Sequence, residues 1–321
     1  MLKYCLLCLS SLLLACPPAV SAQSAWRDLL AQGRRALEAG HHAGAEALLV
    51  KASHLAHETD HRGHVMVEPL RNLARAYASE GRLADSERVL RSVVEIWQRS
   101  FGPDHPGVAG RLRDVAEACR QQKKTAETLD ALQRAATVIE KTLGPEQPAV
   151  ALTVARIADA HRDSGDGVAA AALYRRAIQT LANTLGPESP PLADVMSEYA
   201  ALLKTLGQPV EAGLYAARAK NIRERRSVVH NRGITPPRIQ HKTSPPYSPA
   251  ARSTTLQGMV TLYVEITAEG LPDNIWILEP LGGGLDQQAI EAVRQWRFQP
   301  AFLENQPVKV ASTIEMNFRL L

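Results

Sequence analysis

A hexapeptide that recurs every 42 residues constrains this chain more than any other feature of its sequence. It reads Phe-Gly-Pro-Asp-His-Pro at 101–106, Leu-Gly-Pro-Glu-Gln-Pro at 143–148 and Leu-Gly-Pro-Glu-Ser-Pro at 185–190. Glycine followed by proline ends a helix, and an acidic residue followed by a second proline suits the first turn of the next helix. Each copy therefore marks a junction between helices, and the constant spacing indicates a stack of similar helical units.

The segments between these junctions repeat on the same spacing. Alanine occupies positions 74, 116, 158 and 200, and glycine occupies 81, 165 and 207, where Lys123 is the exception. Small residues at fixed positions let antiparallel helices approach closely, and the glycines mark the turn inside each pair. With a more degenerate pair before them, the pattern predicts five helix pairs at about 24–58, 65–100, 107–142, 149–184 and 191–226.

This pattern resembles tetratricopeptide repeats. The resemblance rests on Leu-Ala-x-x-Tyr-x-x-x-Gly at 73–81 and on Leu-Tyr-Arg-Arg-Ala at 173–177. The 42-residue spacing with Leu-Gly-Pro-Glu junctions is similar to the kinesin-light-chain type. The resemblance implies a right-handed α-solenoid over residues 24–226, with a concave face that binds peptides or proteins.

The helical pattern stops near Ser227, and the chain changes character. Proline pairs at 236–237 and 245–246 predict an extended linker, because proline fixes the backbone and removes hydrogen-bond donors. Beyond it, apolar and polar residues alternate, which predicts strands over 259–267 and 309–320. Between these strands the glycines at 282–284 predict the start of a helix, which we expect to carry Trp296 on its apolar face and to end at Pro300.

This C-terminal part resembles the C-terminal domain of TonB proteins. The matching residues are Pro-Tyr-Ser-Pro-x-Ala-Arg at 246–252, Gly-Leu-Asp-x-x-Ala at 284–289, Ala-Val-x-x-Trp-x-Phe-x-Pro at 292–300 and Asn-Phe at 317–318. The resemblance implies an antiparallel three-stranded sheet packed on helices, and recognition of an outer-membrane transporter's N-terminal peptide by strand addition. Energy-coupling members also carry an uncleaved N-terminal membrane helix. This chain has a short leader instead, which argues against direct energy coupling.

The first 22 residues are typical of an export signal. Lys3 precedes an apolar run at 4–15, and small residues at 20–22 suit cleavage. The run is shorter than the roughly 20 apolar residues of a membrane span. Leu-Leu-Ala-Cys ending at Cys16 is similar to a lipobox, so an outer-membrane lipoprotein is the alternative. Because Pro17 directly follows that cysteine, we expect cleavage after residue 22 and a periplasmic location in a Gram-negative cell envelope.

No motif of a known catalytic site occurs in the sequence. We find no nucleophile elbow, phosphate loop or metalloprotease helix, so we expect no enzyme, no cofactor and no small-molecule substrate. Cys119, the only cysteine beyond the leader, is expected to be a buried and inert thiol. The stretch 218–242 carries eight basic residues against Glu224, but it has no interleaved aromatics, so nucleic acid is not an expected partner.

Histidines at 54, 57, 61 and 64 have a spacing that could bind a metal on one face of a continuous helix. The 42-residue spacing, however, places a helix junction between the second and fourth of them. We therefore expect a solvated loop and no metal site.

The sequence thus divides into a signal peptide at 1–22, a tetratricopeptide-repeat domain at 24–226, a linker at 227–240 and a TonB C-terminal domain at 241–321. The predicted function is a periplasmic adaptor that binds proteins or peptides in the envelope and is linked to outer-membrane transport. The alternative is a structural or scaffold module unrelated to transport. The candidate partner-binding residues are Tyr247 in the family motif and Lys309, Thr313, Glu315 and Asn317 along the last strand.

Overall fold

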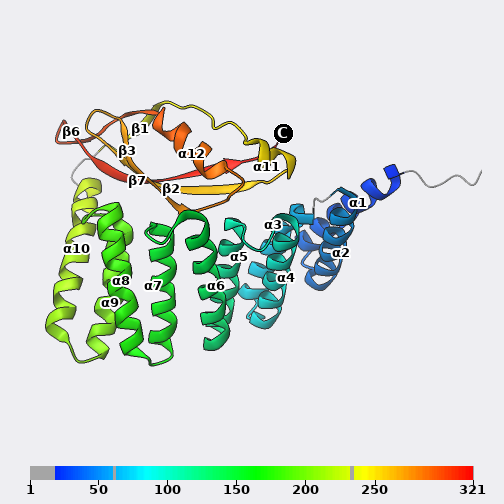
Figure 1. The fold of residues 1–321 in the computed structure, drawn as a ribbon, viewed down its shortest axis with the longest axis horizontal. Coiled ribbons are helices and arrows are strands. Elements are labelled where there is room, and N and C mark those ends of the chain that lie inside the picture. The colour runs from blue at the N-terminus through cyan, green and yellow to red at the C-terminus, as the bar shows by residue number, and fades with distance from the viewer. Residues whose placement is uncertain (1–18, 61–62, 232–234, 321) are drawn as a thin grey trace, which may run out of the picture.

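The computed structural model describes residues 19–60, 63–231 and 235–320. In this part of the chain, ten long helices form a curved row, and a small α+β domain lies across one end of the helices (Figure 1). The predicted export signal lies largely in residues 1–18, outside the described residues, and the first helix begins at Ala19. No helix in the described ranges is long and apolar enough to cross a membrane.

The helices form the five antiparallel pairs that the repeat predicts. They are α1 (Ala19–Glu38) with α2 (His42–Asp60), α3 (Val67–Ser79) with α4 (Leu83–Phe101), α5 (Pro106–Gln121) with α6 (Thr125–Leu143), α7 (Pro148–Asp163) with α8 (Gly167–Leu185), and α9 (Pro190–Thr205) with α10 (Pro209–Asn231). A short 3₁₀ helix, η1 (Gly63–Met66), precedes α3. The predicted α-solenoid is confirmed.

The turn inside each helix pair explains the glycines of the repeat. Gly81, Gly165 and Gly207 have φ values of 76, 88 and 72°. Lys123, the exception, adopts the same left-handed conformation with φ 58°. A non-glycine residue there costs about 1–2 kcal/mol, so the packing of the two helices imposes this turn on a residue that does not favour it.

Small residues and a few large rings fill the solenoid core. The alanine column at 74, 116, 158 and 200 is buried throughout. Tyr77, Tyr174 and Tyr199 are almost fully buried, and the rings of Tyr174 and Tyr199 lie 5.9 Å apart. Cys119 is fully buried in this core, and burial raises the pKa of its thiol to about 11, as expected for an inert cysteine.

The C-terminal domain contains three small antiparallel sheets and two helices. Its elements are β1 (Arg238–His241), α11 (Pro249–Ser253), β2 (Gly258–Ile266), β3 (Pro272–Glu279), α12 (Leu285–Arg294), β4 (Arg297–Gln299), β5 (Ala301–Leu303), β6 (Gln306–Val308) and β7 (Val310–Phe318). The main sheet has the strand order β3-β2-β7, and β1-β4 and β5-β6 form two-stranded ribbons. This is the three-stranded sheet with helices that the resemblance implies.

Two boundaries differ from the prediction. Helix α10 continues to Asn231, and β1 pairs with β4, so most of the stretch 227–240 belongs to folded elements and the linker is shorter than expected. Helix α12 ends at Arg294 instead of reaching Pro300, so Trp296 does not lie on it. Residues 297–299 leave the helix because their backbone pairs with β1, which a local pattern does not show.

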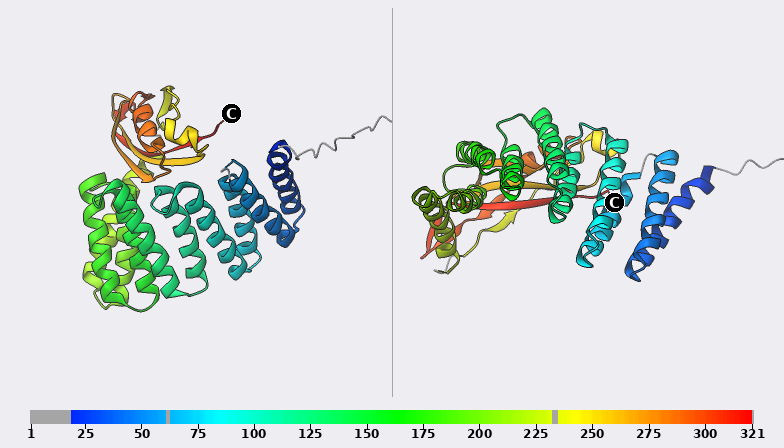
Figure 2. Two further views of the ribbon diagram at one scale, coloured as in Figure 1. Left: turned by 45° about the vertical axis from the view of Figure 1, so that its right-hand side comes forward. Right: turned by 90° about the horizontal axis from the view of Figure 1, so that it is seen from below.

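The C-terminal domain packs directly on the solenoid (Figures 1 and 2). Strand β3 contacts α7, and Arg113 of α5 forms an ion pair with Glu279 of β3 at 3.3 Å. Tyr263 of β2 is buried, with its hydroxyl 3.5 Å from the carbonyl oxygen of Leu185. Gly282 also lies at this contact, where a Cβ atom would come within 2.6 Å of the His105 ring.

The prediction of a solvated loop around the histidines is wrong for His64. Helix α2 ends at Asp60, so the stripe does break at the junction, and His61 lies outside the described residues. His64, however, is 6% exposed, and its Nε2 lies 3.1 Å from the carbonyl oxygen of Thr255 in the C-terminal domain. In the described ranges, no three His, Cys, Asp or Glu side chains lie close enough together to hold a metal ion.

Candidate functional site

Strand β7 forms one edge of the main sheet. It pairs with β2 over its whole length, from Val310 opposite Ile266 to Phe318 opposite Gly258. Within the described residues no strand pairs with its other side. The outward N–H and C=O groups of an edge strand are a template for another extended chain. In the view from below, β7 (red) lies largely clear of the helices (Figure 2, right).

The side chains of β7 alternate as the sequence predicts. Thr313, Glu315 and Asn317 are exposed, whereas Met316 and Phe318 are buried against the domain core. The exposed residues pair with Tyr263, Thr261 and Met259 of β2, and directly paired residues lie on the same face of a sheet. The exposed side chains of β7 therefore lie on the face of the sheet that β2 directs toward the solenoid. The sequence of β7 alone did not indicate this.

Lys309, just before β7, joins the ends of the other two strands. Its Nζ lies 2.5 Å from Glu265 at the end of β2 and 3.5 Å from Asp273 at the start of β3. The hydrogen bond to Glu265 raises the pKa of Lys309, which therefore stays charged. This predicted partner-binding residue thus also links the ends of β2 and β3.

Tyr247 lies at the opposite end of β7. Its hydroxyl donates a hydrogen bond to the carbonyl oxygen of Leu256 at 3.0 Å, and its ring packs edge-on against Phe318 at 5.8 Å. Burial raises the pKa of Tyr247. The structure therefore places Thr313, Glu315 and Asn317 on β7, with Lys309 just before its start and Tyr247 packed against its end.

Two residues that sequence analysis did not single out hold the chain around the helices α11 and α12. The Ser248 hydroxyl caps α11 by accepting a hydrogen bond from the Ala251 N–H at 3.0 Å, and it donates one to the carbonyl oxygen of Gly283. The buried Asp286 carboxylate accepts the N–H groups of Leu281 and Gly282 at 2.7 and 2.9 Å. Both residues belong to the sequence motifs that carry the family resemblance, and these motifs were the signal by which the two residues could have been found.

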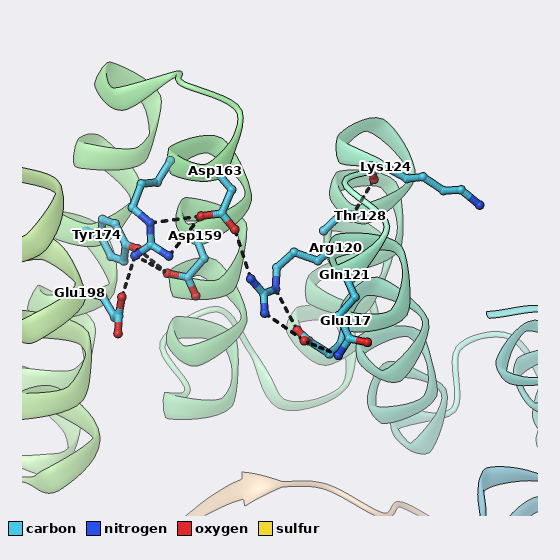
Figure 3. A network of polar contacts seen from close by, with 10 residues as sticks. Glu117, Arg120, Gln121, Lys124, Thr128, Asp159, Asp163, Tyr174 and Glu198 are labelled. Atoms are coloured by element: carbon cyan, nitrogen blue, oxygen red, sulfur yellow. Dashed lines mark hydrogen bonds and ion pairs between the residues drawn. The ribbon is translucent and has the colours of Figure 1, made fainter. Parts of the chain in front are cut away.

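A second polar feature crosses the solenoid from α5 to α9 (Figure 3). Arg120 of α5 binds Glu117 on its own helix and Asp163 of α7. Arg162, 42 residues further along the chain, donates to Glu198 of α9 at 2.6 Å. Because the same position of two successive repeats carries an arginine, ion pairs link three repeats in a row.

The residues of this polar network are partly buried, and the pKa values of two of its carboxyl groups are shifted. Burial raises the pKa of Asp159, which accepts a hydrogen bond from the Tyr174 hydroxyl, whereas the hydrogen bond from Arg120 lowers the pKa of Glu117. A cavity of about 420 Å³ lies beside it, lined by residues that include Arg120, Thr128 and Asp163. The surface offers charged donors and acceptors to a bound chain, in keeping with a binding face.

The side chain of Glu87 on α4 bonds to residues of the neighbouring helix pair. Its side chain is 9% exposed and accepts hydrogen bonds from Lys124 at 2.7 Å, Arg91 at 2.7 Å and Gln122 at 2.9 Å. Burial opposes its ionisation, but these three donors outweigh burial and lower its pKa from 4.5 to about 2. The carboxylate therefore connects α4 to the turn between α5 and α6.

We expect Glu87→Gln to cost about 2–3 kcal/mol of stability at pH 7, since it removes charge-assisted bonds and leaves Lys124 without its partner. The pKa of Glu87 is lower in the folded state, so its contribution is complete above about pH 4.5 and disappears as the pH falls through 2. Denaturant unfolding at several pH values measures this difference. The exposed Glu127→Gln is the control; equal losses in the two variants at pH 7 would contradict the prediction.

Two family models match separate parts of the chain. Residues 243–320 match the Gram-negative bacterial TonB protein C-terminal, and residues 66–141 and 110–179 match a tetratricopeptide repeat. Protein TonB of Vibrio cholerae serotype O1 is 31% identical over 86 residues. These residues are 26% of this chain and 35% of that protein, so the chain spans about a third of the length of this curated relative.

Solved structures resemble the helical part. BtubC from P. vanneervenii is 18% identical, with 65% of this chain and 91% of that chain covered and a TM-score of 0.50. A putative kinesin light chain of Podosopora anserina with nearly identical TPR-like repeats is 22% identical, with 65% and 98% covered and a TM-score of 0.47. At these identities, the comparison with BtubC supports the solenoid fold alone. The chain therefore joins a tetratricopeptide-repeat domain to a TonB C-terminal domain, a combination that marks it as a protein-interaction adaptor with TonB-like features.

Proposed function

We propose that this protein is a periplasmic adaptor of the Gram-negative envelope that acts by binding proteins and not by catalysis. In this proposal the solenoid binds one protein partner, and β7 binds an extended peptide from another. The observation that carries the proposal is the outer side of β7, which pairs with no strand in the described part of the domain. The second partner is the N-terminal segment of an outer-membrane transporter, the peptide that the TonB resemblance implies.

The two edges of the main sheet differ in a way that favours β7. Strand β3, the other edge, packs against α7, and its Glu279 is paired with Arg113. Strand β7 is nine residues long, so its outer N–H and C=O groups can form several main-chain hydrogen bonds with a peptide. Thr313 and Glu315 are exposed beside that edge and have no role in the domain core. Backbone pairing would provide most of the affinity, and these side chains would adjust specificity.

The test is binding of transporter N-terminal peptides from the same organism to the full chain. We expect Thr313→Pro and Glu315→Pro to weaken binding at least about tenfold, because proline removes an N–H donor and distorts the strand. Thr313→Ala and Glu315→Gln keep the backbone and should change the dissociation constant by less than about threefold. Ile314→Pro is the matched comparison. The N–H groups of neighbouring residues in a strand point to opposite sides, so this proline removes an N–H on the other side of β7 from the one removed in Thr313→Pro and Glu315→Pro.

The outcomes separate the alternatives. Equal binding by folded proline variants and the unmodified chain would rule out strand addition at β7. If no transporter peptide binds while the sheet is shown to be folded, the link to transport fails. A structural or scaffold module of the envelope would then remain, with the solenoid as its binding surface.

A further inference from the structure

A cavity of about 230 Å³ lies where the two domains meet. The solenoid contributes four arginines to it, Arg71 from α3, Arg111 and Arg113 from α5, and Arg156 from α7. The C-terminal domain closes the other side with residues that include Met259, Glu279 and Leu281. Three carboxylates, of Asp114, Glu117 and Glu279, line the same space, so four arginines face three acidic side chains. Each of these charged groups is costly to take partly out of water unless it is closely paired.

Arg111 is buried and only loosely paired with a carboxylate. Its side chain is 14% exposed and its guanidinium lies over the Trp97 ring at 4.9 Å. The nearest carboxylate, on Asp114, is 3.7 Å away, and the buried Nε of Arg111 has no hydrogen-bond partner in the described structure. Asp114 is engaged more closely by Arg71, whose Nε lies 2.9 Å from it. Arg111 thus combines burial with an unused donor.

Arg113 is also buried beside this space. Arg113 is 10% exposed, and its carboxylate partner, Glu279, is 3.3 Å away across the domain boundary. Burial lowers the pKa of both Arg111 and Arg113, and the charges of Arg71 and Arg156 lower them further. Arg156 is exposed at the rim of the cavity and faces the same space. An anion beside Arg111 would stabilise its buried charge.

We propose that this cavity is a binding site for a small oxyanion, either a phosphate group or a carboxylate, held by Arg111 and Arg156 with Arg113 beside them. The planar fork of a guanidinium matches both kinds of group, and the free Nε of Arg111 supplies a donor that is already desolvated.

The experiment titrates the full-length protein with inorganic phosphate at constant ionic strength, with chloride as the replaced ion, and follows binding by calorimetry and by the unfolding temperature. We expect saturable binding and a rise in the unfolding temperature that chloride does not produce. Arg156→Gln, at the exposed rim, should weaken phosphate binding at least about tenfold without lowering the unfolding temperature measured in the absence of phosphate. Arg134→Gln, on the exposed face of α6, is the control and should bind like the unmodified chain.

Two further variants extend the test. Arg111→Met should abolish phosphate binding, and the same unfolding measurement checks that this variant is folded. Glu117→Gln removes a negative charge from the cavity wall without changing its shape, so it should tighten phosphate binding about threefold. Acetate titrations show whether a carboxylate occupies the same site, with the same dependence on Arg156. Phosphate binding no stronger than chloride, or dissociation constants that are equal in Arg156→Gln, Glu117→Gln and the control, would overturn the proposal.

Discussion

Trp296→Ala is expected to remove about 3–5 kcal/mol from the stability of the C-terminal domain. The indole is 2% exposed, and its Nε1 donates a hydrogen bond to the carbonyl oxygen of Thr243 at 2.8 Å. Its ring lies 6.0 Å from that of Phe298, and the Nζ of Lys242 lies 5.2 Å from its centre. The substitution therefore leaves a cavity and removes the donor that bonds to the Thr243 carbonyl group. A small domain with a typical stability of about 5–15 kcal/mol would lose much of it.

Amide hydrogen exchange of the two domains measures this effect separately. We expect faster exchange in β2 and β7 and little change in α7 to α10. Trp276→Ala is the matched control, because that indole is only half-buried and bonds to Asn274 within its own strand. A loss below about 1 kcal/mol in Trp296→Ala, or a loss no larger than in the control, would show that the ring is not central to this core.

Gly270→Ala is the second change with a large expected effect, about 3–5 kcal/mol. Gly270 turns the chain from β2 to β3 with φ 77°, a conformation that alanine rarely adopts. A Cβ atom there would lie 1.9 Å from the carbonyl oxygen of Phe298, so the backbone would have to move. That movement would also break the 2.9 Å hydrogen bond from the Phe298 N–H to the Gly270 carbonyl oxygen.

Gly207→Ala separates backbone conformation from crowding. Gly207 has a similar φ of 72°, but no atom lies within 4 Å of a Cβ placed on it. We expect it to lose only about 1 kcal/mol, the cost of the left-handed conformation alone. Chemical denaturation with hydrogen exchange in each domain gives both values. Similar losses for the two glycines would mean that the contact with Phe298 can relax.

Peptide binding and oxyanion binding involve neighbouring parts of the molecule. The β7 edge lies on the C-terminal domain, whereas the arginine cavity joins that domain to α3, α5 and α7. Asn317 of β7 pairs with Met259, and Met259 lines the cavity. A ligand in the cavity is therefore one residue away from the strand that is proposed to bind the peptide, so the two titrations should also be carried out together.

Local patterns in the sequence determined the helices, the turns and the alternation of the last strand. The Gly-Pro junctions and the alanine columns predicted all five helix pairs to within a few residues, because helix ends and close helix packing depend on neighbouring residues. The strands β2 and β7 were predicted for the same reason, since alternation with a period of two is set by the geometry of one strand. The candidate residues Thr313, Glu315 and Asn317 followed from that alternation and are exposed as expected.

Only the tertiary structure decided which groups meet across the chain. Trp296 leaves its helix because residues 297–299 pair with β1, and His64 is buried because Thr255 lies against it. Lys123 adopts a left-handed turn that its own preference opposes, because the helices on either side are held together by the core. The arginine cavity joins α5 to strands more than 140 residues later in the chain. Such contacts depend on how whole elements pack, and no local pattern encodes the distance between them.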